Sequence, residues 1–307
     1  MLYVSTRNPA DTYTAYRAIH EDVTPDGGQY VPFHLPVFNR EELAALRGQS
    51  FCATVAQVLN LLFSLNLSGW DIESVVGKMP VKLEAVGQRL EIAELWHNSE
   101  GDSQHIFNHL YKLISQSDHT PAGWTVVAIK IALLFGIYST TEKPLVNFDV
   151  AVNADDFSDV TAVCYCKKMG LSVNLTICAC NEGSSVWDLV NKGEFSTGTY
   201  NPKYLESFLY AYFDAEQVQI YLKALQGKAT YYMDESCHQV LNEGLFAAVV
   251  SDRRADTVIA SMLSSNQYAL DTNAALSYGA LQDYRASIGI SNDTLILSKK
   301  RPAKAKE

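Results

Sequence analysis

The sequence predicts an α/β fold in which a mainly parallel β-sheet is flanked by helices. Strand-like and helical patterns alternate along residues 148–191, and this alternation is typical of parallel sheet units. The chain has 307 residues, of which 48% are hydrophobic. This length and composition are enough for a large buried core in one large or two medium domains.

The N-terminal 80 residues are predicted to be a mostly helical region. Residues 24–28 (Thr-Pro-Asp-Gly-Gly) are dense in turn formers, and Asn39, Ser50 and Asp71 are residues that commonly open helices. The expected elements are a strand at 2–4, a helix at 12–21, an extended segment at 30–32, and helices that begin at 39, 50 and 71.

The remaining residues, 81–307, are predicted to supply the sheet. Two strand-like runs on either side of Gly87 and Gln88 suggest a hairpin or adjacent strands, and polar segments at 98–103 and 117–123 interrupt the helices that follow. The expected strands are 81–86, 89–95, 148–152, 175–180, 230–233 and 294–297. The expected helices are 104–116, 124–138, 158–169, 184–191, 203–225, 235–250, 256–263 and 273–288.

Charge and hydropathy exclude two classes of partner. The formal net charge is −10 and the isoelectric point is about 5.2, so the phosphates of nucleic acid would be repelled. The longest apolar runs, 126–129 and 131–137, are separated by Lys130, and each is too short to span a bilayer. The N-terminus lacks a basic region followed by an apolar stretch, so we expect no export signal and a cytoplasmic protein.

The cysteines are expected to be reduced in that compartment. They are Cys52, Cys164, Cys166, Cys178, Cys180 and Cys237. The two Cys-x-Cys pairs could supply four zinc ligands, but structural zinc sites usually separate paired cysteines by about two to four residues on a turn. Here one pair ends a strand pattern and the other lies in a helical pattern. We therefore interpret them as small buried hydrophobic residues and expect no metal.

Several short motifs are shared with a known enzyme family. Residues 3–7 (Tyr-Val-Ser-Thr-Arg) and 24–32, with their Pro-Asp-Gly-Gly turn, resemble the opening of the threonine synthases. Residues 165–171 and 177–182 are similar to that family's Lys-Lys-Met-Gly-Leu and Ile-Cys-Ala-Thr-Asn-Glu segments, and residues 297–304 to its Leu-Ser-Thr-Ala-His-Pro-Ala-Lys segment. The resemblance implies the three-layer large domain of the fold-type-II enzymes, whose cofactor is pyridoxal phosphate.

The resemblance also shows which catalytic residue is missing. In the family, a lysine in a His-Gly-Pro-Thr-x-x-Phe-Lys-Asp-Phe segment forms a Schiff base with the cofactor. His97 lies at the start of the corresponding stretch here, and Gln104 stands at the position of the lysine. An amide cannot form an imine, so this covalent chemistry is not available at Gln104.

The residues that hold the cofactor in the family are altered as well. The family's Pro-Ser-Gly-Asn-Phe-Gly-Asp loop directs backbone N–H groups at the phosphate. This chain has Asn153, Ala154, Asp155, Asp156, Phe157, Ser158 and Asp159 there. Both glycines are absent, and the carboxylates at 155 and 156 would repel a dianion. Lys299 replaces the threonine that faces the pyridine nitrogen, so we expect that pyridoxal phosphate does not bind.

A third difference concerns the family's smaller catalytic domain. Between Asp118 and Trp124 the family has a whole segment with a Thr-Ser-Gly-Asp-Thr-Gly loop, and this chain has only a short turn. We therefore expect that most of this domain is deleted, with the deletion point near 117–123. The resemblance then divides the chain into a threonine-synthase-like region, residues 1–80, and a reduced α/β domain, residues 81–307.

Three functions remain open. The first is a catalytically inactive relative, a pseudoenzyme, that acts as an interaction or regulatory module and pairs with a full-length threonine synthase or with itself. The second is a small-molecule binding protein whose residual cleft selects an amine or amino acid through Asp155 and Asp156. The third is an enzyme of amino-acid biosynthesis, a lyase of the threonine synthase type or one that uses other residues.

The other candidate catalytic residues surround the loop at 98–103. They are His97, His105 and His109 with Glu94, Glu100 and Asp102. His105 and His109 also fall on one face of the predicted helix, a spacing that suits a metal. Surface histidines at helical spacing are common, however, so the spacing does not by itself indicate a metal site.

Overall fold

The protein is described here by a computed structural model that covers residues 1–119, 123–154, 156–196, 203–227, 230–289 and 292–303. Its centre is a six-stranded sheet of order β10-β7-β6-β11-β5-β4. The strands are β4 (Lys82–Ala85), β5 (Leu90–Glu94), β6 (Phe148–Asn153), β7 (Val173–Cys180), β10 (Leu245–Val249) and β11 (Thr294–Ser298). Neighbouring strands are parallel except for the β4–β5 hairpin, so the expected mainly parallel sheet is confirmed.

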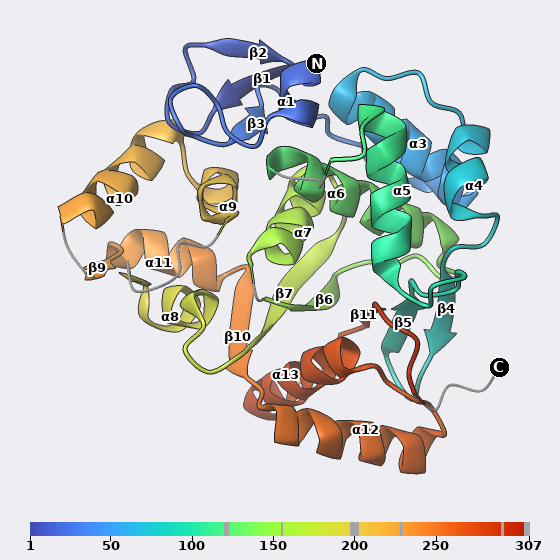
Figure 1. The fold of residues 1–307 in the computed structure, drawn as a ribbon. Helices are drawn as coiled ribbons and strands as arrows, with labels where there is room; N and C mark the ends of the chain where they lie inside the picture. Colours follow the sequence, from blue (N-terminus) through green and yellow to red (C-terminus); the bar gives the residue numbers. More distant parts are fainter. Residues whose placement is uncertain (120–122, 155, 197–202, 228–229, 290–291, 304–307) are drawn as a thin grey trace.

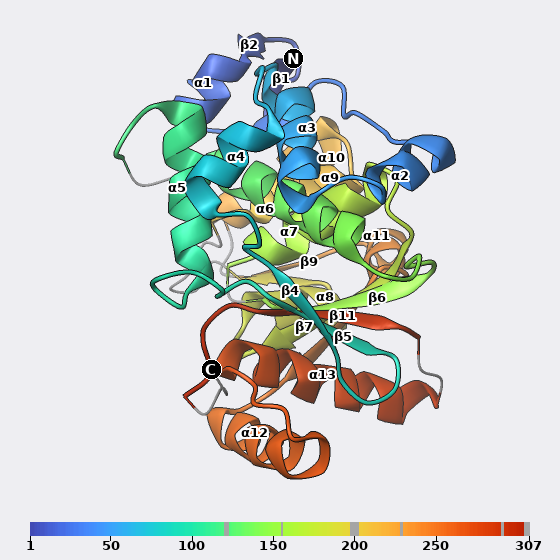
Figure 2. The ribbon, with the colours of Figure 1, turned by 90° about the vertical axis from the view of Figure 1, so that its right-hand side faces the viewer.

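Helices cover both faces of this sheet and complete three layers (Figures 1 and 2). One face carries α6 (Gly123–Thr140) and α7 (Ser158–Lys168), and behind them α3 (Phe51–Phe63) and α5 (Ser103–Ser115). The other face carries α12 (Asp252–Asn266) and α13 (Thr272–Ile288). Successive strand residues point to opposite faces, so Val150 and Val152 enter the larger core while Ala151 enters the smaller one.

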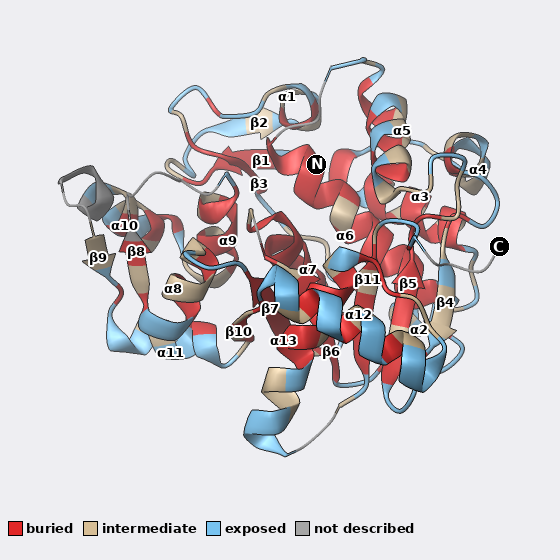
Figure 3. Ribbon diagram, turned by 60° about the horizontal axis from the view of Figure 1, so that its bottom comes forward, coloured by how far each residue is buried: buried red, intermediate tan, exposed pale blue. Residues whose placement is uncertain are grey.

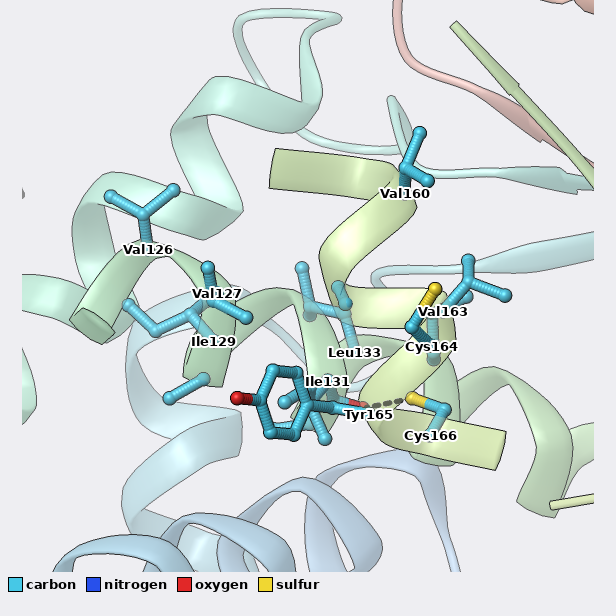
Figure 4. Packing of buried hydrophobic residues seen from close by; sticks show 14 of the residues in the cluster. Val126, Val127, Ile129, Ile131, Leu133, Val160, Val163, Cys164, Tyr165 and Cys166 are labelled. Carbon is cyan, nitrogen blue, oxygen red and sulfur yellow. Dashed lines mark hydrogen bonds between the residues drawn. The ribbon is translucent and has the colours of Figure 1, made fainter. Parts of the chain in front are cut away.

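Helix α6 is the centre of the larger core. By length and composition it could cross a membrane, but 89% of its residues are buried inside the protein, as expected for a core helix. Gly136 allows α3 to pack closely, because a Cβ there would lie 2.7 Å from the Phe51 ring. Figure 4 shows Ile131 of α6 beside α7, where the Cys166 thiol donates to the Ile131 carbonyl oxygen at 3.8 Å.

The N-terminal region combines a small sheet with helices. Strands β1 (Leu2–Ser5), β2 (Thr12–Thr14) and β3 (Tyr30–Pro32) pair antiparallel in the order β2-β1-β3. The helices are α1 (Ala15–His20), α2 (Arg40–Leu46), α3 and α4 (Gly69–Val76). Asn39 caps α2 and Ser50 caps α3, as predicted. The predicted start of α4 at Asp71 is wrong, because Ser68 is the N-cap and Asp71 completes its capping box.

An outlying group of elements lies beside strand β10. It consists of α8 (Ser185–Lys192), β8 (Glu194–Ser196), α9 (Leu205–Tyr212), α10 (Ala215–Gly227), β9 (Thr230–Tyr232) and α11 (Glu235–Asn242). The predicted helix at 235–250 is wrong in its second half, where the chain forms β10 after Gly244. Figure 3 shows that this group exposes much more surface than the central strands.

Candidate functional site

A small cavity lies at the carboxyl-terminal edge of the central strands, where ligands bind in open α/β sheets. Its volume is about 110 Å³. Its apolar walls are Leu95, Phe107, Leu133, Leu134, Ile137, Val152, Val163 and Leu297. Its polar walls are Ser103, Gln104, Lys130, Asp159 and Lys299. The structure therefore brings together three residues that the sequence singled out, namely Gln104, Asp159 and Lys299.

Gln104 reaches this cavity from the first turn of α5. Its side-chain amide is exposed and donates to Asn108 Oδ1 at 2.8 Å, and its backbone N–H donates to the Asp102 carboxylate that caps the helix. The preceding residue, Ser103, donates its backbone N–H to the Lys299 carbonyl oxygen at 2.7 Å. This bond holds the start of α5 against the segment that follows β11, so Gln104 and Lys299 share one cavity wall.

The centre of the site is an ion-pair cluster of two lysines and one aspartate. Asp159 Oδ1 lies 2.9 Å from Lys130 Nζ, and Asp159 Oδ2 lies 2.5 Å from Lys299 Nζ. The Asp159 side chain is only 10% exposed, and the lysines are 23% and 24% exposed. Burial alone would raise the pKa of Asp159, but the two ammonium groups outweigh it and hold that pKa well below its usual range.

The pKa of Lys299 shifts in the opposite direction, upward. Burial alone would lower its pKa, but the Asp159 carboxylate raises it above the usual value for lysine. Lys130 lies on α6 and also donates to Ser158 Oγ at 2.5 Å. Sequence reasoning missed Lys130 and treated it only as an interruption between apolar runs. The signal was present, because a single charged residue within an otherwise apolar core helix needs a buried partner.

The segment at the position of the family's phosphate loop connects β6 to α7. Asp156 Oδ1 accepts hydrogen bonds from the Ser158 backbone N–H at 3.0 Å and from Ser158 Oγ at 2.5 Å. The protein's own carboxylate therefore occupies the start of α7, where a bound anion would otherwise accept backbone N–H groups. Phe157 adopts a left-handed backbone (φ 64°) and packs on Phe208 with ring centroids 5.0 Å apart.

The other residues of this segment support the loop. Ala154 is buried, and its backbone N–H donates to the Ala179 carbonyl oxygen at 2.9 Å. Asn153 Nδ2 lies 3.4 Å from Asn273 Oδ1 at the start of α13. Asp155, which was predicted to help select a ligand, lies outside the described residues.

The histidine candidates are held in local contacts outside the cavity. Glu94 accepts hydrogen bonds from Tyr268 Oη and His97 Nε2, both at 2.6 Å, and the His97 ring stacks on Trp96. The rings of His105 and His109 lie 4.0 Å apart, and His109 Nδ1 bonds the His105 carbonyl oxygen at 2.8 Å. Within the described part of the chain, no three His, Cys, Asp or Glu side chains are grouped to hold a metal ion.

The paired cysteines lie in the hydrophobic core. Cys164 and Cys166 on α7 and Cys178 and Cys180 on β7 are all buried free thiols. Burial raises the pKa of Cys164 to about 11 and that of Cys178 well above its usual value, so these groups are poor thiolate ligands at neutral pH. They serve here as small packing residues.

Comparisons with known proteins find the same fold in other proteins. Residues 2–79 match the family model for the threonine synthase N terminus. The pyridoxal-phosphate-bound threonine synthase of Brucella melitensis is similar over 99% of this chain and 89% of its own, with a TM-score of 0.86 and 16% identity. The yeast enzyme has a TM-score of 0.78 and 14% identity, and the match covers 99% of this chain and 88% of the enzyme. The Escherichia coli enzyme has a TM-score of 0.76 and 14% identity, and the match covers 99% of this chain and 89% of the enzyme. The comparison with curated protein sequences gave no match.

These matches confirm the expected resemblance to threonine synthases at the level of the fold. The predicted division of the chain at residue 80 stays a prediction. The predicted deletion near 117–123 stays a prediction, and residues 120–122 lie outside the described part of the chain.

Proposed function

Since this chain has the fold of the threonine synthases, we propose that it is a catalytically inactive cytoplasmic protein whose cofactor site is filled by its own charged side chains. One observation carries the proposal: Asp159, at the centre of the site, is paired with both Lys130 and Lys299. The positive charges that could hold a ligand phosphate are thereby balanced from within the protein. The same fold without its cofactor then serves as an interaction or regulatory module.

The cavity around the ion-pair cluster is small for pyridoxal phosphate. Sites that enclose a ligand of this size usually measure about 300 Å³ or more. The cavity here measures about 110 Å³, and its apolar walls are buried core side chains. Asp156 also occupies the start of α7, so the phosphate would meet a carboxylate instead of free N–H groups.

The lysines in the cavity do not replace the missing catalytic lysine. Imine formation needs a neutral amine, and the pairing with Asp159 raises the pKa of Lys299 and so keeps it charged at neutral pH. Lys130 Nζ is bound by both Asp159 and Ser158. Both lysines thus act as ion-pair partners, which supports an inactive protein.

Borohydride fixation of the cofactor, together with an activity assay, tests this proposal. Purified protein is mixed with pyridoxal phosphate, reduced with borohydride and analysed by mass spectrometry, and threonine formed from O-phosphohomoserine is measured in parallel. A catalytically competent threonine synthase serves as the positive control. We expect no stoichiometric fixation of the cofactor on Lys130 or Lys299 and no threonine. Stoichiometric fixation on one of these lysines, beyond the labelling of exposed surface lysines, or threonine formation above background would overturn the proposal.

Gln104→Lys sharpens the test, because it restores the family's reactive group at its own position. If the ion pairs and the small cavity keep the cofactor out, this variant also takes up none. If the variant alone binds the cofactor, the site is intact apart from one residue, and the self-filled site is not the cause of inactivity.

An interaction module needs a partner surface, and two large apolar side chains in and after α4 are exposed to solvent. Trp70 on α4 is 80% exposed, and Met79 just beyond this helix is 74% exposed. We propose that such a surface contacts a full-length threonine synthase or a second copy of this chain. Size-exclusion chromatography with light scattering, alone and with a threonine synthase from the same cell, tests this, and Trp70→Ser should weaken the complex. A protein that stays monomeric both alone and in the presence of the synthase would contradict the proposed contact.

A further inference from the structure

The small cavity has more hydrogen-bond donors than the protein satisfies. Each lysine ammonium carries three N–H donors and no acceptor. Among the described residues, Lys130 Nζ bonds Asp159 and Ser158, while Lys299 Nζ bonds Asp159 alone. Three donors of the two ammonium groups are therefore free to bind a ligand acceptor in place of water, since both side chains are about a quarter exposed.

Other charges near these lysines are already engaged. Asp156 accepts its hydrogen bonds from Ser158, at the start of α7. Asp271 caps α13 and accepts from Ser298 Oγ and the Lys299 backbone N–H. Both carboxylates thus lie at helix N-termini, whose partial positive charge offsets them. Neither lines the cavity, where the charged groups are Lys130, Lys299 and Asp159.

From this arrangement we propose that the cavity binds a short-chain monocarboxylate of about two to four carbons. A carboxylate has acceptors only, which complements the free lysine donors. An ammonium group has donors only, so an amine would meet donors with donors. The apolar walls, such as Phe107 and Leu133, suit a short hydrocarbon tail. The assignment rests on the proposed function, because it requires that no cofactor fills the site.

Size favours a small ligand. The cavity measures about 110 Å³, whereas sites for drug-sized ligands usually measure about 300 Å³ or more. Acetate, propionate and butyrate are therefore better candidates than longer fatty acids or pyridoxal phosphate.

Saturation-transfer NMR and calorimetry with three isosteric probes test the class of ligand. Propionate, propionamide and propylammonium are added to wild-type protein at matched ionic strength in a buffer free of carboxylates. Propionate is expected to bind about tenfold or more tightly than either other probe, because only it offers charged acceptors to both lysines. Equal binding of propionamide, tighter binding of propylammonium, tighter binding of inorganic phosphate, or no binding of propionate would each overturn the assignment.

Variants locate the site. Lys130→Met and Lys299→Met are each expected to lower the affinity for propionate about tenfold or more, because each removes a charged donor. Lys112→Met is the matched control, since Lys112 on α5 is 65% exposed and pairs with the exposed Asp118. Lys130→Arg retains the charge, so it distinguishes lost binding from lost folding. Unchanged propionate affinity in both methionine variants would also overturn the proposal.

The two proposals can fail separately. If the protein fixes pyridoxal phosphate covalently, the proposed inactivity fails whatever propionate does. If it takes up neither the cofactor nor propionate, only the carboxylate site fails. Asp159→Asn adds a gain-of-binding test, because removal of the internal carboxylate frees both lysines and should tighten propionate about tenfold or more.

Discussion

Replacement of Asp159 by asparagine should destabilise the protein far more than the loss of an ordinary surface charge. The variant leaves Lys130 and Lys299 with no carboxylate between them, and all three side chains are at most about a quarter exposed. Removal of one partner from a buried pair typically costs about 3–5 kcal/mol. Because some water reaches the lysines, we expect a loss of free energy of unfolding near the lower end, about 3 kcal/mol.

Urea unfolding followed by circular dichroism measures this loss. Asp188→Asn is the matched control, because Asp188 pairs with the more exposed Lys192 at 2.8 Å within α8. This control should unfold close to the wild-type midpoint, since exposed pairs within a helix contribute little. If Asp159→Asn and Asp188→Asn shift the midpoint by similar amounts, the ion-pair cluster is not a buried structural element and the reasoning fails.

The pH dependence of the same experiment gives a second check. The folded pKa of Asp159 is depressed below that of the unfolded chain, about 3.9. Its contribution to stability is therefore fully present above about pH 4 and is lost as the pH falls toward the folded pKa. The stability gap between wild type and Asp159→Asn should narrow below about pH 4. A gap that stays constant down to the acid transition would contradict this assignment.

Three further predictions test the fold. Gly170→Ala should cost about 3 kcal/mol or more, because φ is 110° and a Cβ would lie 2.3 Å from the Phe38 carbonyl oxygen. Gly289→Ala, at φ 66° in open space, should lower the free energy of unfolding by only about 1 kcal/mol. Equal urea midpoints for the two glycine variants would refute this difference. Native protein should react rapidly with Ellman's reagent at Cys237 alone, since the other thiols are buried; two fast thiols would be inconsistent with this packing. Asn39→Ala should cost about 1 kcal/mol by loss of the capping box, measured as a shift in urea midpoint, and an unchanged midpoint would disprove it.

If the proposed function holds, a self-filled site would explain how the fold persists without its chemistry. A vacant cofactor site would leave buried donors and charges without partners, and such groups destabilise a protein. Here Asp156 satisfies the start of α7, and Asp159 neutralises lysines from α6 and from the segment after β11. These residues therefore stabilise the carboxyl-terminal edge of the central strands.

Local sequence patterns were enough to predict most of the elements. Helices α2 and α3 have polar N-caps followed by apolar residues at helical spacing, so short-range interactions fix where they begin. The alternation of strands and helices along the chain predicted the parallel sheet, because each helix connects one strand to a parallel neighbour. Strand β10 was missed because a short apolar run can be a buried strand or a buried helix segment, and only its pairing with β7 decides between them.

By itself, the sequence determined the fold class and the resemblance to threonine synthases. It also aligned Gln104 with the lysine that binds the cofactor in that family. Only the tertiary structure revealed the pairing of Asp159 with Lys130 and Lys299, the cavity beside them and the hydrogen bonds of Asp156 with Ser158. Secondary structure follows from periodicity and capping among neighbouring residues. The ion-pair cluster instead depends on how α6, α7 and the segment after β11 pack together. Lys130 within an apolar helix signals a buried partner, but no local pattern identifies Asp159 as that partner.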